Sequence, residues 1–146
     1  MSYLETTEDP RNPGAKLIEN TLVIFTSDNG SDVNEQRAVG NLRAYKAHIY
    51  EGGQRVPLIA YWKNGGIGDA VVGNGGTNRD DLIALQDLYP TISGLIGRPL
   101  DAPASSRAPA VDGFALPMAF KNQPTPPRPP VLTNENNGNT WLALQY

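Results

Sequence analysis

Cysteine is absent from this sequence, histidine occurs once, and there is neither a long hydrophobic run nor an excess of basic residues. Without cysteine there is no disulfide, no thiolate metal site and no cysteine nucleophile. A single histidine excludes zinc sites built from several histidines. No apolar run approaches the ~18 residues that a membrane-spanning helix needs. Twelve basic and 15 acidic residues give a net charge of -3, so we expect neither nucleic acid nor a membrane as a partner.

The remaining composition is that of a folded but loop-rich chain. Hydrophobic residues make up 39% of the 146 positions, alongside 15 glycines and 13 prolines. This length fits one domain or a piece of a larger one. The N-terminal residues 1–13 are polar and do not match a signal peptide, and the localisation is left unassigned.

Two short apolar runs predict strands. Leu22–Phe25 is continuous, rich in branched and aromatic side chains, and followed by the turn residues Ser27–Gly30. A run without alternation is typical of a strand buried on both faces of a parallel or mixed sheet with helices on its sides. The second run is Val56–Trp62, in which Pro57 is restricted to a strand start or an edge.

A helix and a terminal hairpin are predicted further along. Residues 87–97 show one apolar face at helical spacing, with Asp87 as the N-cap and Gly97 just beyond the C-terminus. Residues 131–133 and 140–146 can pair across an asparagine-rich turn. Together these elements predict an α/β chain that is rich in loops.

The candidate chemistry lies in the long polar segment 27–55. Asp28 and Asn29 follow the first strand directly, where ligands bind in open α/β sheets, and their oxygens suit Ca²⁺ or Mg²⁺. The alternative interpretation is an Asx turn that ends the strand. Lys46 could neutralise an oxyanion or be an ordinary solvated lysine. His48 is more typical of a structural histidine than of a base, and it is given no role.

Several stretches resemble the sulfatases of the alkaline-phosphatase superfamily. Residues 20–30 are similar to the late metal-binding strand of that family, and Leu42-Arg43-x-x-Lys46 followed by residues 50–57 is similar to its lysine-containing loop. Residues 87–97 resemble the next helix, and residues 112–117 a following turn. The stretches occur in the family's order.

The resemblance implies a fold and residue roles. It implies a partial alkaline-phosphatase-like mixed sheet with flanking helices and a C-terminal hairpin. Asp28 and Asn29 would be ligands of the active-site divalent cation, usually calcium. Lys46 would bind the sulfate of a sulfate ester and stabilise charge on the bridging oxygen during cleavage. The implied segments are an irregular lead-in at 1–15, the C-terminal portion of the catalytic domain at 16–120, and a proline-rich linker with the start of a small sheet at 121–146.

The chain departs from the family in its nucleophile. Sulfatases mature a Cys or Ser in a Cys/Ser-x-Pro-x-Arg motif to formylglycine, and this chain contains no such motif; residues 103–107 place the proline on the wrong side. The paired aspartates, histidines and further lysine that complete the family's site are also missing. We therefore expect part of a sulfatase, inactive alone, with strand edges prone to self-association. The alternative is a non-catalytic, sulfatase-like binding module.

Overall fold

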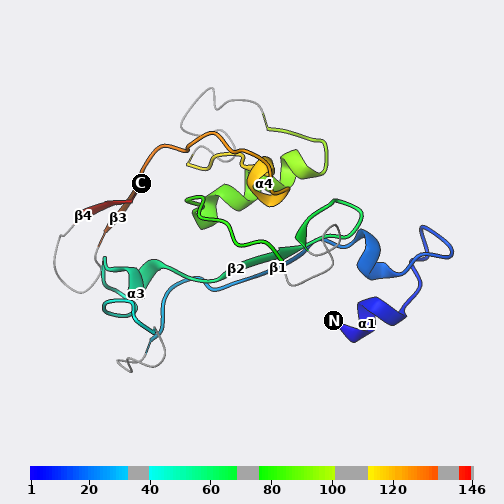
Figure 1. Ribbon diagram of the computed structural model, residues 1–146, viewed down its shortest axis with the longest axis horizontal. Coiled ribbons are helices and arrows are strands. Elements are labelled where there is room, and N and C mark those ends of the chain that lie inside the picture. The colour runs from blue at the N-terminus through cyan, green and yellow to red at the C-terminus, as the bar shows by residue number, and fades with distance from the viewer. Residues whose placement is uncertain (33–39, 69–75, 101–111, 135–141, 146) are drawn as a thin grey trace. The chain divides into compact units, whose positions relative to one another are not determined.

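A computed structural model describes residues 1–32, 40–68, 76–100, 112–134 and 142–145 (Figure 1). The chain divides into two compact units, which are described separately. One comprises Met1–Ile24 and Ala60–Pro127, and the other Phe25–Ile59 and Arg128–Tyr146. The predicted mixture of helices and strands is confirmed. Within the described ranges, no helix is both long and apolar enough to cross a bilayer.

Both predicted strands form. Strand β1 (Val23–Thr26) and strand β2 (Leu58–Tyr61) are neighbours in a two-stranded sheet, and β2 begins immediately after Pro57, as the proline requires. Their expected burial on both faces is wrong for this chain, because the side chains of Phe25 and Ile59 are 62% and 61% exposed. The faces of a sheet are buried by helices or by a second sheet packed on them, and these two side chains lack such a cover.

The first residues are more regular than the sequence indicates. Within residues 1–15, which were expected to be irregular, Ser2–Thr6 form the short helix α1. The 3₁₀ helix η1 (Leu17–Asn20) follows this segment. Between them Asp9 is almost fully buried and accepts a hydrogen bond from the backbone N–H of Arg11 at 3.0 Å. Local backbone hydrogen bonds of this kind can form in sequences without strong apolar periodicity.

The predicted helix is α4 (Leu88–Leu95), which follows the 3₁₀ turn η3 (Leu85–Asp87) and ends before Gly97, whose φ is 75°. Asp87 precedes α4 as expected, but its side chain does not cap that helix. Its carboxylate instead accepts the N–H groups of Ala84 at 2.8 Å and Phe114 at 2.9 Å. The buried carboxylate thereby joins segments far apart in the sequence.

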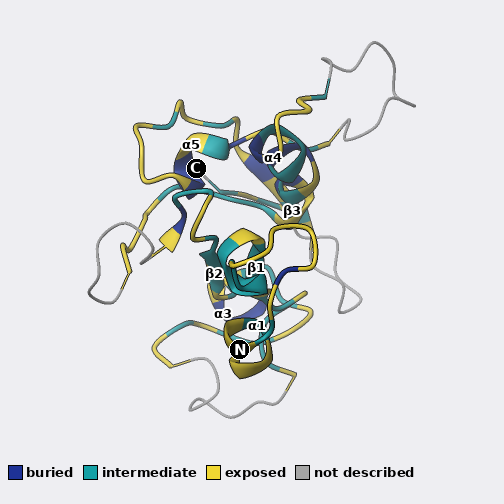
Figure 2. Ribbon diagram, turned by 90° about the vertical axis from the view of Figure 1, so that its right-hand side faces the viewer, coloured by how far each residue is buried: buried dark blue, intermediate teal, exposed yellow. Residues whose placement is uncertain are grey.

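The neighbouring segment holds a short helix that the sequence analysis missed. Residues 117–120, for which the sequence analysis gave no helix, form helix α5 (Pro117–Phe120), which begins with the proline that favours a first helical turn. Thr91 of α4 is fully buried, and its hydroxyl oxygen accepts the N–H of Leu116 at 2.9 Å. Figure 2 shows that buried residues gather on α4 and α5.

The second unit contains the predicted hairpin. Strands β3 (Val131–Asn134) and β4 (Leu142–Gln145) pair antiparallel, with Val131 opposite Gln145 and Leu132 opposite Leu144. The turn between them lies outside the described residues. Helix α3 (Glu51–Gln54), which was not predicted, lies in the same unit, and the amide of Gln145 donates to the side-chain oxygen of Gln54 at 3.2 Å.

Candidate functional site

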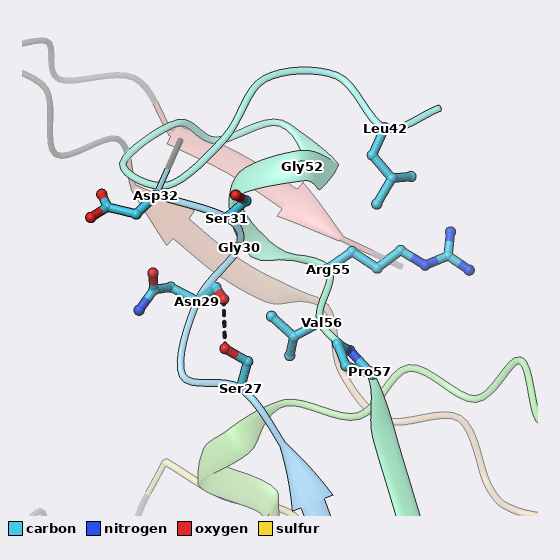
Figure 3. A pocket seen from close by; sticks show the side chains of 10 residues that line it. All are labelled: Ser27, Asn29, Gly30, Ser31, Asp32, Leu42, Gly52, Arg55, Val56 and Pro57. Carbon is cyan, nitrogen blue, oxygen red and sulfur yellow. Dashed lines mark hydrogen bonds between the residues drawn. The ribbon is translucent and has the colours of Figure 1, made fainter. Parts of the chain in front are cut away.

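The candidate metal ligands lie in a tight turn that follows β1. The hydroxyl of Ser27 donates to the carbonyl oxygen of Asn29 at 2.9 Å (Figure 3). It also lies 3.5 Å from a carboxylate oxygen of Asp28. Asp28 is exposed and Asn29 is partly exposed. The turn therefore holds its own backbone shape through Ser27 and presents the carboxylate of Asp28 outward.

The lysine lies in a second loop whose backbone folds back on itself. The N–H of Gly52 donates to the carbonyl of Arg43 at 2.8 Å, and the N–H of Gly53 to that of Tyr50 at 2.9 Å. Ala44 and Ala47 have φ values of 63° and 75°, in the left-handed region that residues with a Cβ seldom adopt. Lys46 is thus held between two sharp reversals of the chain, which fix the direction of its backbone.

The two loops contact each other through their backbones. The N–H of Gly30 donates to the carbonyl of Gly53 at 2.9 Å, and the N–H of Lys46 donates to the carbonyl of Ser31 at 2.8 Å. A Cβ added to Gly30 would overlap the carbonyl oxygen of Gly52. Glycine is required at position 30 because the approach leaves no room for a side chain.

This contact brings the lysine next to the aspartate turn. The ammonium nitrogen of Lys46 lies 3.7 Å from a carboxylate oxygen of Asp32, four residues after Asp28. Both side chains are largely exposed, at 46% and 82%, so the pair adds little stability. The loop of Lys46 therefore contacts Ser31 and Asp32, which follow the Asp28–Asn29 turn, and the ion-pair partner of the lysine is Asp32.

A pocket of about 640 Å³ opens where the chain leaves β1 and enters β2 (Figure 3). Asn29 lines it, whereas Asp28 and Lys46 do not. Asp32 and Arg55 contribute its two charged side chains. The full lining is Ser27, Asn29, Gly30, Ser31, Asp32, Leu42, Gly52, Arg55, Val56 and Pro57.

Sequence reasoning missed Asp32 and Arg55 as residues of this pocket. Arg55 belongs to the stretch 50–57 that carries the resemblance, so the motif itself was the signal that could have found it. Asp32 stands at the Asp28-x-Gly30-x-Asp32 spacing, which hints at a calcium loop although the EF-hand pattern is not completed, and this spacing was the signal that could have found it. His48 packs edge-on against the ring of Tyr45 at 4.8 Å between ring centroids, a contact that suits a structural residue.

The side-chain oxygens of Asp28 and Asn29 are of the type that a hard cation binds, but they are too few to complete its coordination shell. Carboxylate and amide oxygens are the ligands that calcium prefers, and it takes 6–8 of them. Among the described residues there is no group of three or more His, Cys, Asp or Glu side chains that could hold a metal ion. Asp28 and Asn29 can therefore supply only part of a calcium shell.

A comparison with known protein families matches more than half of this chain. The family model described as Sulfatase matches residues 15–98, which include both loops and helix α4. The chain belongs to the sulfatase family.

The sulfatase segment is similar to proteins that are several times longer. It is 40% identical to human arylsulfatase A over 87 residues, which are 58% of this chain and 16% of that protein. It is 33% identical over 123 residues to a sulfatase of Formosa agariphila, covering 82% of this chain and 20% of the relative. The match to human steryl-sulfatase is 33% over 93 residues, 58% of this chain and 15% of that protein. The chain thus spans about a fifth or less of these three relatives.

Proposed function

We propose that this chain is the part of a sulfatase, a sulfuric ester hydrolase, that supplies two calcium ligands and the sulfate-binding lysine. The ligands are Asp28 and Asn29, and the lysine is Lys46. The observation that supports this most directly is the contact between the two loops. The hydrogen bond from Lys46 N–H to the carbonyl of Ser31 supports the proposal, because it joins the loop of the lysine to the segment that follows Asp28 and Asn29.

The chemistry follows from charge. Hydrolysis turns a sulfate ester and water into an alcohol and sulfate, and negative charge develops on the bridging oxygen as the sulfur–oxygen bond breaks. A bound calcium ion would supply positive charge for the sulfate oxygens. Lys46 stabilises the developing charge by donating a hydrogen bond from its ammonium group. Asp32 holds that ammonium group near the turn until an anion replaces it.

The chain does not supply the nucleophile, so we infer that it is inactive alone. It has no cysteine and no Ser-x-Pro-x-Arg motif. The formylglycine and the remaining calcium ligands would come from sulfatase residues beyond this sequence. In that assembled enzyme, residues 16–120 would form the C-terminal portion of an alkaline-phosphatase-like catalytic domain. Residues 121–146 would form a proline-rich linker and the start of a small C-terminal sheet.

The proposed roles are tested by ligand binding to the purified chain. Calcium and sulfate are titrated calorimetrically, and hydrolysis of an aryl sulfate is followed in parallel. We expect weak calcium binding that Asp28→Ala abolishes and Glu5→Ala preserves. Sulfate binding should be lost in Lys46→Ala and kept in Lys121→Ala, which changes an exposed lysine at the end of helix α5. Turnover by the chain alone, or equal binding by all variants, would refute the proposal.

A further inference from the structure

The pocket beside the two loops has walls of different chemistry. Figure 3 shows Asn29 and Asp32 on one side, while Arg55 runs out to the side on which Leu42 lies. Val56 and Pro57 complete the apolar part of the lining. Lys46, the proposed sulfate-binding residue, does not line the pocket, but its ammonium nitrogen lies 3.7 Å from a carboxylate oxygen of Asp32 on the polar side. With the ester sulfate at that end, the opposite wall is where the rest of a substrate would lie. A ring could pack on these apolar side chains with Arg55 at its outer end.

The exposure and contacts of the Arg55 side chain favour a role in ligand binding over a role in stabilising the fold. Its side chain is 67% exposed, and among the described residues its guanidinium makes one hydrogen bond, from Nη1 to Glu51 Oε2 at 3.0 Å. Glu51 lies one helical turn earlier and is itself exposed. Such an exposed pair contributes little to stability, so another anion can compete for the guanidinium. The remaining N–H groups suit a planar carboxylate or a sulfate.

From this arrangement we infer that Arg55 forms an anion subsite, so that the substrates are sulfate esters carrying a second negative charge on the leaving group. A sulfate ester whose ring also bears a carboxylate or a further sulfate places one anion at each end of the pocket. The ester sulfate lies towards Lys46, and the second anion pairs with Arg55 in place of Glu51. The inference rests on the proposed function, since that assignment fixes which end takes the ester.

The test compares two probes that differ in one charge and hardly in size. They are para-sulfobenzoate and its carboxamide, para-carbamoylbenzenesulfonate, titrated into the purified chain in calcium-containing buffer. We expect the carboxylate probe to bind about tenfold more tightly, the value for one charge-assisted hydrogen-bonded pair. Arg55→Gln should remove that difference and leave the affinity for the carboxamide unchanged. Glu51→Gln, which removes the competing carboxylate, should widen the difference.

The outcomes separate the subsite from the proposed function. Lys46→Ala should weaken both probes by the same factor if the sulfonate occupies the ester position. If both probes bind equally to the unmodified chain in a Lys46-dependent way, the subsite is wrong and the proposed function stands. The same conclusion holds if the tenfold difference survives in Arg55→Gln. If neither probe binds, both the subsite and the sulfate-binding role of this chain are refuted.

Discussion

Gly30 is the residue on which the contact between the two loops most directly depends. Its N–H bonds to Gly53, and a Cβ would overlap the carbonyl oxygen of Gly52. We expect Gly30→Ala to lower the free energy of unfolding by about 1–3 kcal/mol, the usual cost of overpacking. It should also separate Lys46 from Ser31. Hydrogen exchange of the Lys46 amide measures this, because that amide donates to Ser31 in the native chain.

A matched control for this change exists in helix α4. A Cβ at Gly94 would lie 3.7 Å from Pro117, an ordinary van der Waals distance. Gly94→Ala should therefore raise the free energy of unfolding by about 0.5–1 kcal/mol, since alanine favours the helix. If the two variants exchanged the Lys46 amide at the same rate, the close approach at Gly30 would not be what positions the lysine.

Lys46 and Asp28 are predicted to act differently in an active sulfatase that contains this segment. Lys46→Ala should lower kcat about 10²–10³-fold, as removal of an electrostatic stabiliser does. Asp28→Ala should weaken calcium binding and activity together, so added calcium should restore part of the rate only in that variant. Kinetics over a range of calcium concentrations measure the difference, and an unchanged rate in both variants would contradict the assigned roles.

Asp9 gives the protein a dependence on acid pH. The backbone N–H and then the guanidinium of Arg11 hold the pKa of Asp9 below its ordinary value of 3.8. The stabilisation is complete above the unfolded-state pKa and is lost as the pH falls through the lower folded-state value. We expect the Asp9 carboxyl to titrate below 3.8 by NMR. Removing the guanidinium in Arg11→Ala should move the pKa of Asp9 back towards that value. A pKa of Asp9 above 3.8 in the unmodified chain would contradict this assignment.

At the scale of elements, the link between α4 and the segment before α5 depends on Thr91. Its buried hydroxyl accepts the N–H of Leu116 at 2.9 Å. Thr91→Val keeps the shape and leaves that N–H without its acceptor, which should cost about 1–3 kcal/mol of the free energy of unfolding. Thr91→Ser retains the acceptor and should cost less. Urea denaturation of both variants measures the difference, and equal losses would show that the methyl group rather than the hydroxyl matters.

The elements also show where sequence reasoning succeeds. Helix α4 and the β3–β4 hairpin were predictable because local signals agree: apolar periodicity with Gly97 in one case, and two branched runs flanking a polar turn in the other. Helix α3 was missed because Glu51-Gly-Gly-Gln54 has poor helix propensity. Its glycines, buried against the carbonyls of neighbouring loop residues, are explained only by tertiary contacts.

The candidate site was predictable to a similar extent. The position of Asp28 and Asn29 after a strand, together with the motif around Lys46, pointed to one region of the chain. The partner of the lysine could not be predicted, because Asp32 reaches it through the folding of two loops. Burial of Phe25 was wrongly predicted, since an apolar run does not reveal whether other elements cover both faces of the strand.

At the scale of the whole molecule, exposed apolar surface should control association. Leu132, Leu142 and Leu144 lie on one face of the hairpin by register and are 63%, 65% and 55% exposed, whereas Val131 on the other face is buried. An uncovered sheet face of this kind favours association because burial removes apolar surface from water. We expect the mass measured by sedimentation to rise with protein concentration.

A charge on this leucine face should shift the chain towards the monomer. Leu144→Lys places a lysine opposite Leu132, where it would be desolvated in any complex that covers the face. Tyr3→Lys adds the same charge to an exposed position of α1 and controls for a change in net charge. We expect the association constant to fall at least about tenfold in Leu144→Lys, the equivalent of burying one unpaired polar group, and to stay near the unmodified value in Tyr3→Lys. If the two variants weakened association equally, net charge would be the cause. If neither did, the chain would associate elsewhere, and the exposed side chains of Phe25 and Ile59 would be the next to alter.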